Sequence, residues 1–315
     1  MKKNYFKKAM YYLIHPLLIK YKMAEKGYIY MDDAHFLSKQ FKIKMGYKMD
    51  FSNPQTFDEK LNWLKLHDRN PLYVKLVDKF EVKKYVENVL GSEYIIPTLG
   101  IYDNFEQIDF DNLPNQFVLK ATHDSGGIYI VKNKSQLDID DARKILTTSL
   151  KRNFFYACRE WPYKDVQPRI IVEQYMEDEK TKELRDYKFY CFNGKVHAVL
   201  VAANRQNRDH ELTFDYYDNS FKKLNLTNHW HPNSNENIDK PVSFDKMVKL
   251  ASEMSEGFPH VRIDFYEVNG KIYFGEYTFY DMGGYLILSP DSWSQEWGDL
   301  IDLSLAYEYK ENQSL

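Results

Sequence analysis

Two charged strand segments near the end of the chain hold the residues with the clearest chemistry. Arg262 and Asp264 lie in one run of apolar and aromatic residues, Glu276 and Thr278 lie in the next, and Asn269-Gly270 separates the runs. This pattern predicts a β-hairpin in which each pair projects from one face of its strand, because side chains alternate along a strand. Two carboxylates beside an arginine suit a divalent metal ion held on a polyphosphate. The alternative is an exposed ladder of salt bridges across the hairpin.

The length of the turn decides whether the two carboxylates share a face. A two-residue loop leaves Asp264 opposite Gly275 and turns Glu276 to the other face. A three-residue loop over 268–270 sets Arg262 opposite Glu276, with Asp264 as its diagonal neighbour. A shared metal site therefore requires the three-residue loop or a bulge elsewhere in the hairpin.

Two earlier segments carry residues suited to a nucleotide. Lys120 ends a predicted strand shortly before Ser125, Gly126 and Gly127. A lysine supplies point charge for phosphates, and a glycine loop can approach them closely because glycine has no Cβ. Glu173 interrupts a later apolar strand, where it could accept a hydrogen bond from an adenine edge. The alternatives are an ordinary hairpin turn and a solvent-exposed glutamate.

The elements that must position these residues follow from periodicity and capping signals. Thr56 and Glu59 form a capping box that opens a helix through Leu66. Further helices are expected at 71–89, 138–152 and 243–256. Strands are expected at 94–101, 117–121, 128–132, 169–175, 186–203 around Asn193-Gly194, 211–217, 261–268 and 271–279. Helices mixed with largely antiparallel strands predict an α+β protein.

The order of these parts resembles the ATP-grasp superfamily, and most closely its TupA-like group, over roughly residues 75–285. In that superfamily a helix begins with Asp-Lys, a strand-loop-strand carries a second lysine and a glycine-rich flap, and a hinge with a glutamate follows. An Arg-x-Asp and Glu-x-Asn array comes last. Three segments carry the closer match: Asn53–Asn62, Leu184–Gly194 and Phe274–Phe279.

The resemblance implies a fold and a division of the chain. Two α+β subdomains would clasp ATP behind a helical N-terminal region. The implied divisions are a basic helical region at 1–50, an N-terminal lobe at 51–110, a small subdomain with the flap at 111–175, and a C-terminal subdomain with the hairpin at 176–315.

The resemblance also implies ATP and Mg²⁺ as cofactors and a role for each candidate residue. The metal Mg²⁺ would be bound by Asp264, Glu276 and Thr278. The nucleotide would be bound by Lys79 and Lys120 at its phosphates, by the loop Ser125-Gly126-Gly127 that covers them, and by Glu173 at its adenine. Arg262 would stabilise an acyl phosphate, and Lys188 and Arg205 would contact phosphate or substrate. Two positions depart from the superfamily: Thr278 stands where it has asparagine, and Asp281 lies in a turn that lacks the Pro-Gly of many relatives.

The implied function is that of an ATP-dependent carboxylate-amine ligase. It would form an amide through an acyl phosphate on a uronic-acid-type sugar, in capsular or other cell-surface polysaccharide biosynthesis. A kinase on the same scaffold would instead phosphorylate a sugar hydroxyl. A glycosyltransferase or a polysaccharide-binding protein would use the 51 aromatic residues (26 Tyr, 20 Phe and 5 Trp) and need no ATP.

The amino-acid composition further limits the possible binding partners and the cellular location. A net charge of −3 without a basic stripe among the aromatics speaks against nucleic acid as a partner. Two cysteines, Cys158 and Cys191, favour reduced thiols and a cytoplasmic chain. Residues 1–22 mix lysines with an apolar run that His15 and Pro16 interrupt. This indicates either a helix packed on the protein's own surface or a basic amphipathic segment at the inner face of the membrane.

Overall fold

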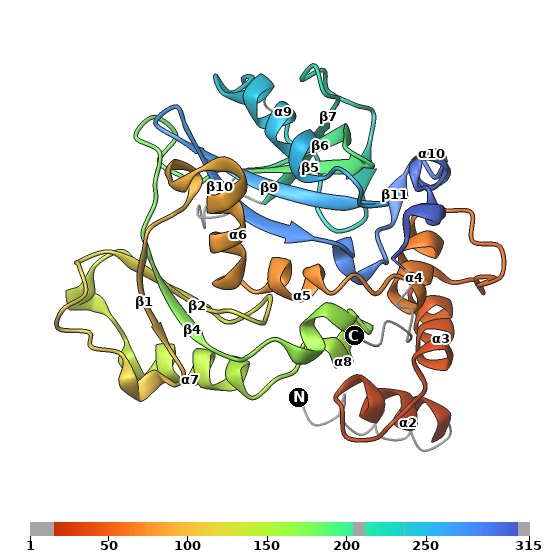
Figure 1. The fold of residues 1–315 in the computed structure, drawn as a ribbon, viewed down its shortest axis with the longest axis horizontal. Helices are drawn as coiled ribbons and strands as arrows, with labels where there is room; N and C mark the ends of the chain where they lie inside the picture. Colours follow the sequence, from red (N-terminus) through yellow and green to blue (C-terminus); the bar gives the residue numbers. More distant parts are fainter. Residues whose placement is uncertain (1–15, 204–211, 236, 308–315) are drawn as a thin grey trace, which may run out of the picture.

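Two antiparallel β-sheets form the centre of the protein, and helices surround them (Figure 1). The computed structural model describes residues 16–203, 212–235 and 237–307. The smaller sheet has the strand order β1-β4-β2-β3, and the larger has the order β10-β9-β5-β6-β7. Helices from several parts of the chain pack around these sheets, as expected for the predicted α+β class.

The smaller sheet holds the predicted strand-loop-strand. It consists of β1 (Thr98–Tyr102), β4 (Ile170–Gln174), β2 (Phe117–Ala121) and β3 (Ile128–Val131). Helix α7 (Ile139–Leu150) contributes the buried Ala142 and Leu146 to a core shared with Phe117 and Leu119. The strand expected at 94–101 starts only at Thr98, because Ser92–Tyr94 form a 3-10 helix.

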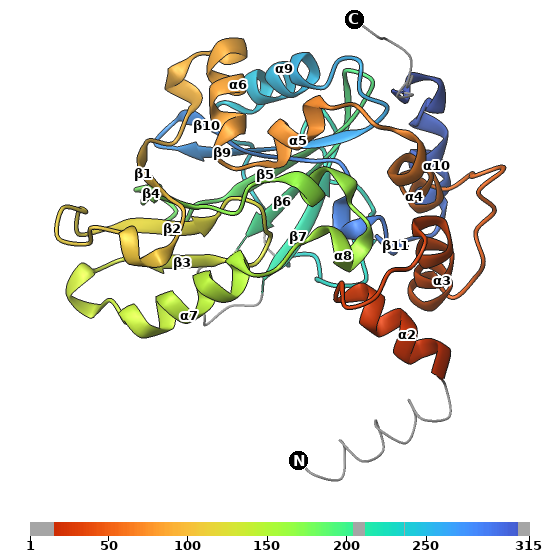
Figure 2. The ribbon, with the colours of Figure 1, turned by 60° about the horizontal axis from the view of Figure 1, so that its bottom comes forward.

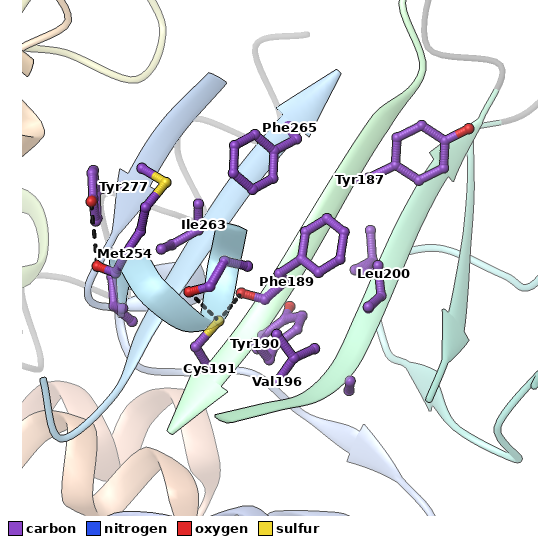
Figure 3. Close-up of a cluster of buried hydrophobic side chains, with 14 of the residues drawn as sticks. Tyr187, Phe189, Tyr190, Cys191, Val196, Leu200, Met254, Ile263, Phe265 and Tyr277 are labelled. Carbon is purple, nitrogen blue, oxygen red and sulfur yellow. Dashed lines mark hydrogen bonds between the residues drawn. The ribbon is translucent and has the colours of Figure 1, made fainter. Parts of the chain in front are cut away.

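The larger sheet holds the main core. It consists of β10 (Lys271–Thr278), β9 (Val261–Val268), β5 (Asp186–Phe192), β6 (Lys195–Ala203) and β7 (Thr213–Tyr217). Every residue of β5 is buried, and Phe189 packs edge-on against Phe265 of β9 (Figure 3). Helix α9 (Phe244–Met254) covers this face, where Met254 O accepts a hydrogen bond from Tyr277 Oη at 3.4 Å (Figure 3).

The single helix expected at 71–89 is wrong. The structure has α5 (Leu72–Val77) and α6 (Glu81–Leu90), separated at an extended Asp78. The carboxylate of Asp78 accepts hydrogen bonds from the backbone N–H groups of Phe80 and Glu81, so it caps the second helix. The Lys79 N–H bonds to Thr122 O at 3.1 Å instead of continuing a helix. The break therefore ties Lys79 to the end of β2.

The remaining helices lie at the other end of the molecule. Helix α4 (Phe57–His67) has the predicted capping box and packs against α10 (Ser292–Leu300). Helices α2 (Pro16–Glu25) and α3 (Asp33–Met45) fall in the region expected to be helical, while residues 1–15 lie outside the described residues. The short elements are α8 (Phe155–Cys158), β8 (Thr227–Asn228), β11 (Leu288–Ser289) and 3-10 turns at Phe105–Gln107, Lys134–Gln136, Trp161–Asp165, Asp281–Gly283 and Leu303–Leu305. Among the described residues, every helix is too short or too polar to cross a lipid bilayer.

Candidate active site

A bulge in the hairpin of β9 and β10 brings the two carboxylates to one face. The turn has two residues, with Val268 paired to Lys271 and both Asn269 (φ 51°) and Gly270 (φ 73°) left-handed. The register then shifts between Phe274 and Glu276, which leaves Gly275 as the extra residue. Of the two arrangements that a shared site requires, the three-residue loop is not formed, and the bulge elsewhere in the hairpin is confirmed.

The bulge sets different partners from those expected. Asp264 lies directly opposite Glu276, and Arg262 lies opposite Thr278. The pairing of Arg262 with Glu276, which a three-residue loop would give, is not formed, because the extra residue is Gly275 in β10 and not Val268 at the end of β9. At Gly275 a Cβ would lie 3.0 Å from Asp264 O, so a larger residue would push the strands apart at the bulge.

Arg262 is the centre of a buried network. Its guanidinium donates to both oxygens of Asp264, from Nε at 2.8 Å and from Nη2 at 2.9 Å. It also donates to Glu276 Oε1 at 3.2 Å and Thr278 Oγ1 at 3.1 Å, and to the carboxylate of Asp281. Burial alone would raise the pKa of Asp264, but Arg262 and Lys188 together hold it below the usual range of a carboxyl group.

The network carries an excess of negative charge. Lys188 pairs with Asp264 and, at 2.7 Å, with Asp186. Four carboxylates, those of Asp186, Asp264, Glu276 and Asp281, thus stand against the two cations Lys188 and Arg262. Two negative charges are left over, which equals the charge of one divalent cation.

The donor set fits Mg²⁺ in part. Among the described residues no three His, Cys, Asp or Glu side chains are grouped as a ready metal cage. Mg²⁺ usually takes only one or two carboxylates, together with phosphate oxygens and waters. The side chain of Glu276 is 42 % exposed and lines the cavity, whereas that of Asp264 is 1 % exposed and already paired. Glu276 therefore fits as the first carboxylate ligand of Mg²⁺. Asp264 fits as a second ligand only if the metal replaces one of its present partners, Arg262 or Lys188.

Three lysines lie on the opposite side of the cavity. Lys79 lies two residues before α6, Lys83 lies in the first turn of α6, and Lys120 comes from β2. Lys79 Nζ donates to Asp124 O at 2.7 Å, and Lys83 Nζ donates to Ile96 O at 2.8 Å. Burial lowers the pKa of Lys79, and the carboxylate of Glu276 partly opposes this. A polyphosphate between these cations and the hairpin would find positive charge on one side and a metal site on the other.

Glu173 is held by two of these lysines. Lys120 Nζ lies 2.6 Å from Glu173 Oε2, and Lys83 pairs with Oε1. Burial opposes ionisation of this carboxyl group, but Lys120 and Lys83 lower its pKa to about 2. Glu173 lies on β4, as expected, and it orients both lysines toward the cavity.

The glycine loop is anchored at its first end. The buried Asp124 accepts hydrogen bonds from the guanidinium of Arg152, from Ser149 Oγ and, at 2.8 Å, from Ser125 N. A Cβ on Gly127 would lie 2.3 Å from Ser149 Oγ, so only glycine fits there. Of the three loop residues, Ser125 lines the cavity.

One cavity of about 300 Å³ connects these groups between the two sheets. Of the residues expected from the sequence, the following line it: Lys79, Lys120, Ser125, Glu173, Lys188, Arg262 and Glu276. Asp264 lies buried behind Arg262 and Lys188. Gly126, Gly127 and Thr278 lie beside the lining residues, and Arg205 falls at 204–211, outside the described residues.

The two ends of the cavity differ in chemistry. Ile95, Ile96 and Phe274 line an apolar end beside Glu173, which suits a purine base. Phe214, Tyr216 and Trp230 line an aromatic end on the far side of Arg262. The charged network lies between them, where phosphates would be placed.

Several lining residues escaped the sequence reasoning although a signal existed. Asp186 and Tyr190 flank Lys188 at the spacing of two that puts strand residues on one face. Lys83 follows Lys79 by four residues, close to one helical turn. Asp281, for which the sequence indicated no role, accepts a hydrogen bond from Tyr190 Oη at 2.5 Å as well as from Arg262.

Helix α4 supports the turn that carries Asp281. Met282 (φ 49°), Gly283 (φ 67°) and Gly284 (φ 75°) are all left-handed, a run that needs outside support. Asn62 Nδ2 donates to Gly284 O at 2.7 Å, and the buried Lys65 ammonium donates to Gly283 O.

A third contact from the same helix face completes this support. Leu286 N donates to the carboxylate of the fully buried Asp58. Asp58, Asn62 and Lys65 recur at helical spacing, so one face of α4 satisfies three backbone groups of the turn. The segment Asn53–Asn62, which carried part of the sequence resemblance, thus lies behind the site.

Comparisons with known proteins agree with this geometry. A family model described as TupA-like ATPgrasp matches residues 59–302. A comparison with curated proteins finds no match.

Solved structures give weaker likenesses. A D-alanine–D-alanine ligase from Bacillus anthracis has a TM-score of 0.44 and 17 % identity, over 85 % of this chain and 84 % of that one. The same enzyme from Helicobacter pylori has a TM-score of 0.43 and 12 % identity, over 80 % and 68 %. The D-cycloserine synthetase DcsG has a TM-score of 0.40 and 14 % identity, over 75 % and 72 %. Structural similarity at such low TM-scores adds nothing to the family match.

Proposed function

Because this chain belongs to the TupA-like ATP-grasp family of ATP-dependent ligases, which use ATP and Mg²⁺, we propose that it joins the carboxylate of a uronic-acid-type sugar to an amine. The product would enter capsular or other cell-surface polysaccharide biosynthesis, in the cytoplasm. The family match rules out the alternative of a protein that uses no ATP. The main support for the proposal is that three lysines and the anionic hairpin line the same cavity from opposite sides.

The proposed nucleotide site uses both walls of the cavity. Lys79 and Lys120 hold phosphates, and the loop from Ser125 covers them. Glu173 meets the adenine: a carboxylate has lone pairs for about four hydrogen bonds, so it can keep both lysines and accept one more. Asp264 and Glu276 hold the metal, with Thr278 as a weaker neutral ligand. Mg²⁺ supplies the positive charge that neutralises the phosphate oxygens.

The proposed reaction has two balanced steps. A carboxylate oxygen of the sugar bonds to the γ-phosphorus, the bond from that phosphorus to the bridging oxygen breaks, and ADP leaves. The amine nitrogen then bonds to the acyl carbon, phosphate leaves, and the proton of the nitrogen passes to solvent. Arg262 and Lys188 line the cavity, and we assign to them the stabilisation of the charge that develops on the transferred group; such fixed charges are worth several kcal/mol in a closed site.

The aromatic end of the cavity supports a sugar as the acceptor. Trp230 is 50 % exposed although it lines a cavity, so a wide apolar face is open to a ligand. Asn228 Oδ1 accepts hydrogen bonds from Trp230 N at 2.8 Å and His231 N at 2.9 Å, and this fixes the backbone beneath the indole. A sugar ring offers an apolar face to such a surface and hydroxyl groups to the polar rim.

The test measures ADP release from Mg²⁺ and ATP with a panel of uronic acids, each with and without a panel of amines. A ligase gives ADP together with an amide only when a uronic acid and an amine are both present. The neutral sugars glucose and galactose are the matched control, and they should give no ADP. A sugar phosphate formed without an amine would replace the ligase by the kinase alternative. Glu276→Gln should lower either activity roughly a hundredfold.

A further inference from the structure

Charge is distributed very unevenly along this chain. Residues 1–26 contain seven lysines and one glutamate, a formal charge of +6, while the whole chain carries −3. The rest of the protein is therefore acidic, at −9. A basic segment attached to an acidic body is drawn to an anionic surface at that end alone.

Helix α2 presents part of this basic segment on a fixed scaffold. Tyr21 and Ala24 are buried, together with Phe36 of α3. Gln40 of α3 donates to Tyr21 Oη at 3.0 Å and to Ala157 O at 2.9 Å, which ties α2, α3 and α8 together. The orientation of α2 is thus set by burial of one face.

The opposite face of α2 combines lysines with exposed apolar side chains. At about 100° per residue, Ile19 and Met23 project away from the side that Tyr21 and Ala24 bury. Lys20 is exposed on the flank of this face, one turn before Met23, and Lys26 is exposed just after the end of the helix. Lys22 is also exposed, but it is paired with Glu25 at 2.5 Å.

The chain after α2 extends this face with two tyrosines. Gly27 (φ 75°) ends the helix, with Gly27 N bonded to Ala24 O and Tyr28 N bonded to Met23 O at 2.9 Å. This is a Schellman motif, which folds Tyr28 back beside the last turn. Tyr28 is 73 % exposed and Tyr30 is 90 % exposed. Tyrosine favours the interface between lipid headgroups and water, where its ring is shielded and its hydroxyl stays hydrated.

This face is far from the candidate active site. Figure 2 shows α2 at the outer margin of the molecule, beyond α3 and α8 and apart from the two sheets. The residues that line the cavity all come from later in the chain, beginning at Lys79. The two surfaces can therefore be occupied at the same time.

We propose that the α2 outer face, defined as Ile19, Lys20, Met23, Lys26, Tyr28 and Tyr30, docks the protein on a membrane that contains anionic lipid. Lysines meet the headgroup charge while the apolar and aromatic side chains enter the interface. Either contribution alone is weak, so stable docking needs both. The proposal concerns where the enzyme acts and does not depend on which substrates it joins.

The test is co-sedimentation of the full chain with vesicles. Vesicles of phosphatidylcholine mixed with phosphatidylglycerol should bind the protein, and binding should fall at high salt because salt screens the lysines. Vesicles of phosphatidylcholine alone should bind far less. Lys20→Gln with Lys26→Gln should weaken binding by about fivefold per lysine. Tyr28→Ser with Tyr30→Ser should also weaken it, by roughly tenfold or more.

Matched controls lie on other surfaces. Val242 is 93 % exposed, so Val242→Ser removes an equally open apolar side chain outside the α2 outer face. Lys195→Gln with Lys249→Gln removes two exposed lysines, one on β6 and one on α9. Both controls should bind vesicles like the wild type. All variants should keep the melting temperature and the affinity for Mg²⁺·ATP.

Three outcomes would overturn the proposal. The first is an absence of vesicle binding by the wild type, and the second is equal binding to neutral and anionic vesicles. The third is wild-type binding by both the lysine and the tyrosine variants. Self-association of the wild type that the tyrosine variant abolishes, without vesicle binding, would reassign the face to contact with a second copy.

Discussion

At the scale of single residues, Asp264 and Glu276 face each other across the hairpin but lie in different surroundings. Asp264 pairs with two buried cations, while Glu276 reaches the cavity. Asp264→Asn should therefore remove both metal binding and a buried ion pair, at a cost of about 3–5 kcal/mol in stability. Glu276→Gln should lower ADP release roughly a hundredfold and leave stability within about 0.5 kcal/mol.

These two variants distinguish a metal-binding role of the carboxylates from a purely structural salt-bridge ladder. Mg²⁺-dependent ATP binding and urea unfolding should be measured on both. Loss of stability in both variants with unchanged Mg²⁺ dependence would support the ladder. The controls are Glu253→Gln and Asp299→Asn, which change exposed carboxylates far from the cavity and should alter neither property.

Glu173 predicts a dependence on pH. The pKa of Glu173 in the folded protein, about 2, lies below the usual value of 4.5, so its pairing with Lys120 and Lys83 stabilises the fold fully above about pH 4.5. That stabilisation should disappear as the pH falls from 4.5 toward 2. Urea unfolding of the wild type and of Glu173→Gln across this range should show the two stabilities converging at low pH. A constant difference would show that the carboxylate is not selectively ionised in the folded protein.

At the scale of elements, α4 is predicted to act as a brace for the site. Lys65→Met should leave Gly283 O buried without a donor, which costs about 1–3 kcal/mol, and should loosen the turn that fixes Asp281 on Arg262. We expect faster hydrogen exchange at residues 282–286 and an affinity for Mg²⁺·ATP lower by roughly tenfold.

The same helix supplies the control for this prediction. Lys60 also donates to a backbone carbonyl, that of Ile301 at 3.0 Å, but on the side of α4 next to α10. Lys60→Met should lose similar stability while exchange at 282–286 and nucleotide affinity stay as in the wild type. Equal nucleotide affinity in the two variants would mean that Lys65 serves the fold alone.

Local signals in the sequence were sufficient for most elements and for the identity of many cavity residues. The capping box at Thr56, the alternation in β2 and the Asn269-Gly270 turn each act over a few residues, so they could be recognised directly. The break at Asp78 could not, because the helical pattern continues through it and the N–H of Lys79 bonds to Thr122 on another element.

Contacts between distant segments explain the other differences. Lys65 is separated from Gly283 by 218 residues, and nothing in a helix of mixed polarity tells which polar face will be buried. The pairing of Arg262 with Asp281 likewise depends on how the turn after β10 folds back. Such long-range hydrogen bonds are consequences of the fold and leave no local pattern in the sequence.

At the scale of the whole molecule, the cavity lies between two separate cores. Leu146 belongs to the core of the smaller sheet and Met247 to that of the larger, and both are fully buried. Leu146→Ala should cost about 2–5 kcal/mol and speed hydrogen exchange mainly within residues 105–172. Met247→Ala should instead act on the larger sheet.

The same hydrogen-exchange experiment with Mg²⁺·ATP present tests whether the nucleotide contacts both cores. Because both sheets line the cavity, the nucleotide should slow exchange in both regions of both variants. Exchange that rises uniformly over the whole chain in Leu146→Ala would show that the protein unfolds as a single unit. Protection by the nucleotide in one region alone would place its site within one core.

The bulge at Gly275 has a consequence for comparing this hairpin with others. In a regular hairpin with the same two-residue turn, the residue opposite Asp264 would be the one at position 275, one residue closer to the turn than Glu276. An alignment without a gap would then match its carboxylate to Gly275 and would report that the acidic residue has been lost. The gap belongs at Gly275 and not in the Asn269-Gly270 turn, since the pairs from Val268–Lys271 to Phe265–Phe274 are regular. Placed there, it aligns Glu276 and Thr278 with their functional counterparts, so relatives with and without the bulge can be compared residue by residue.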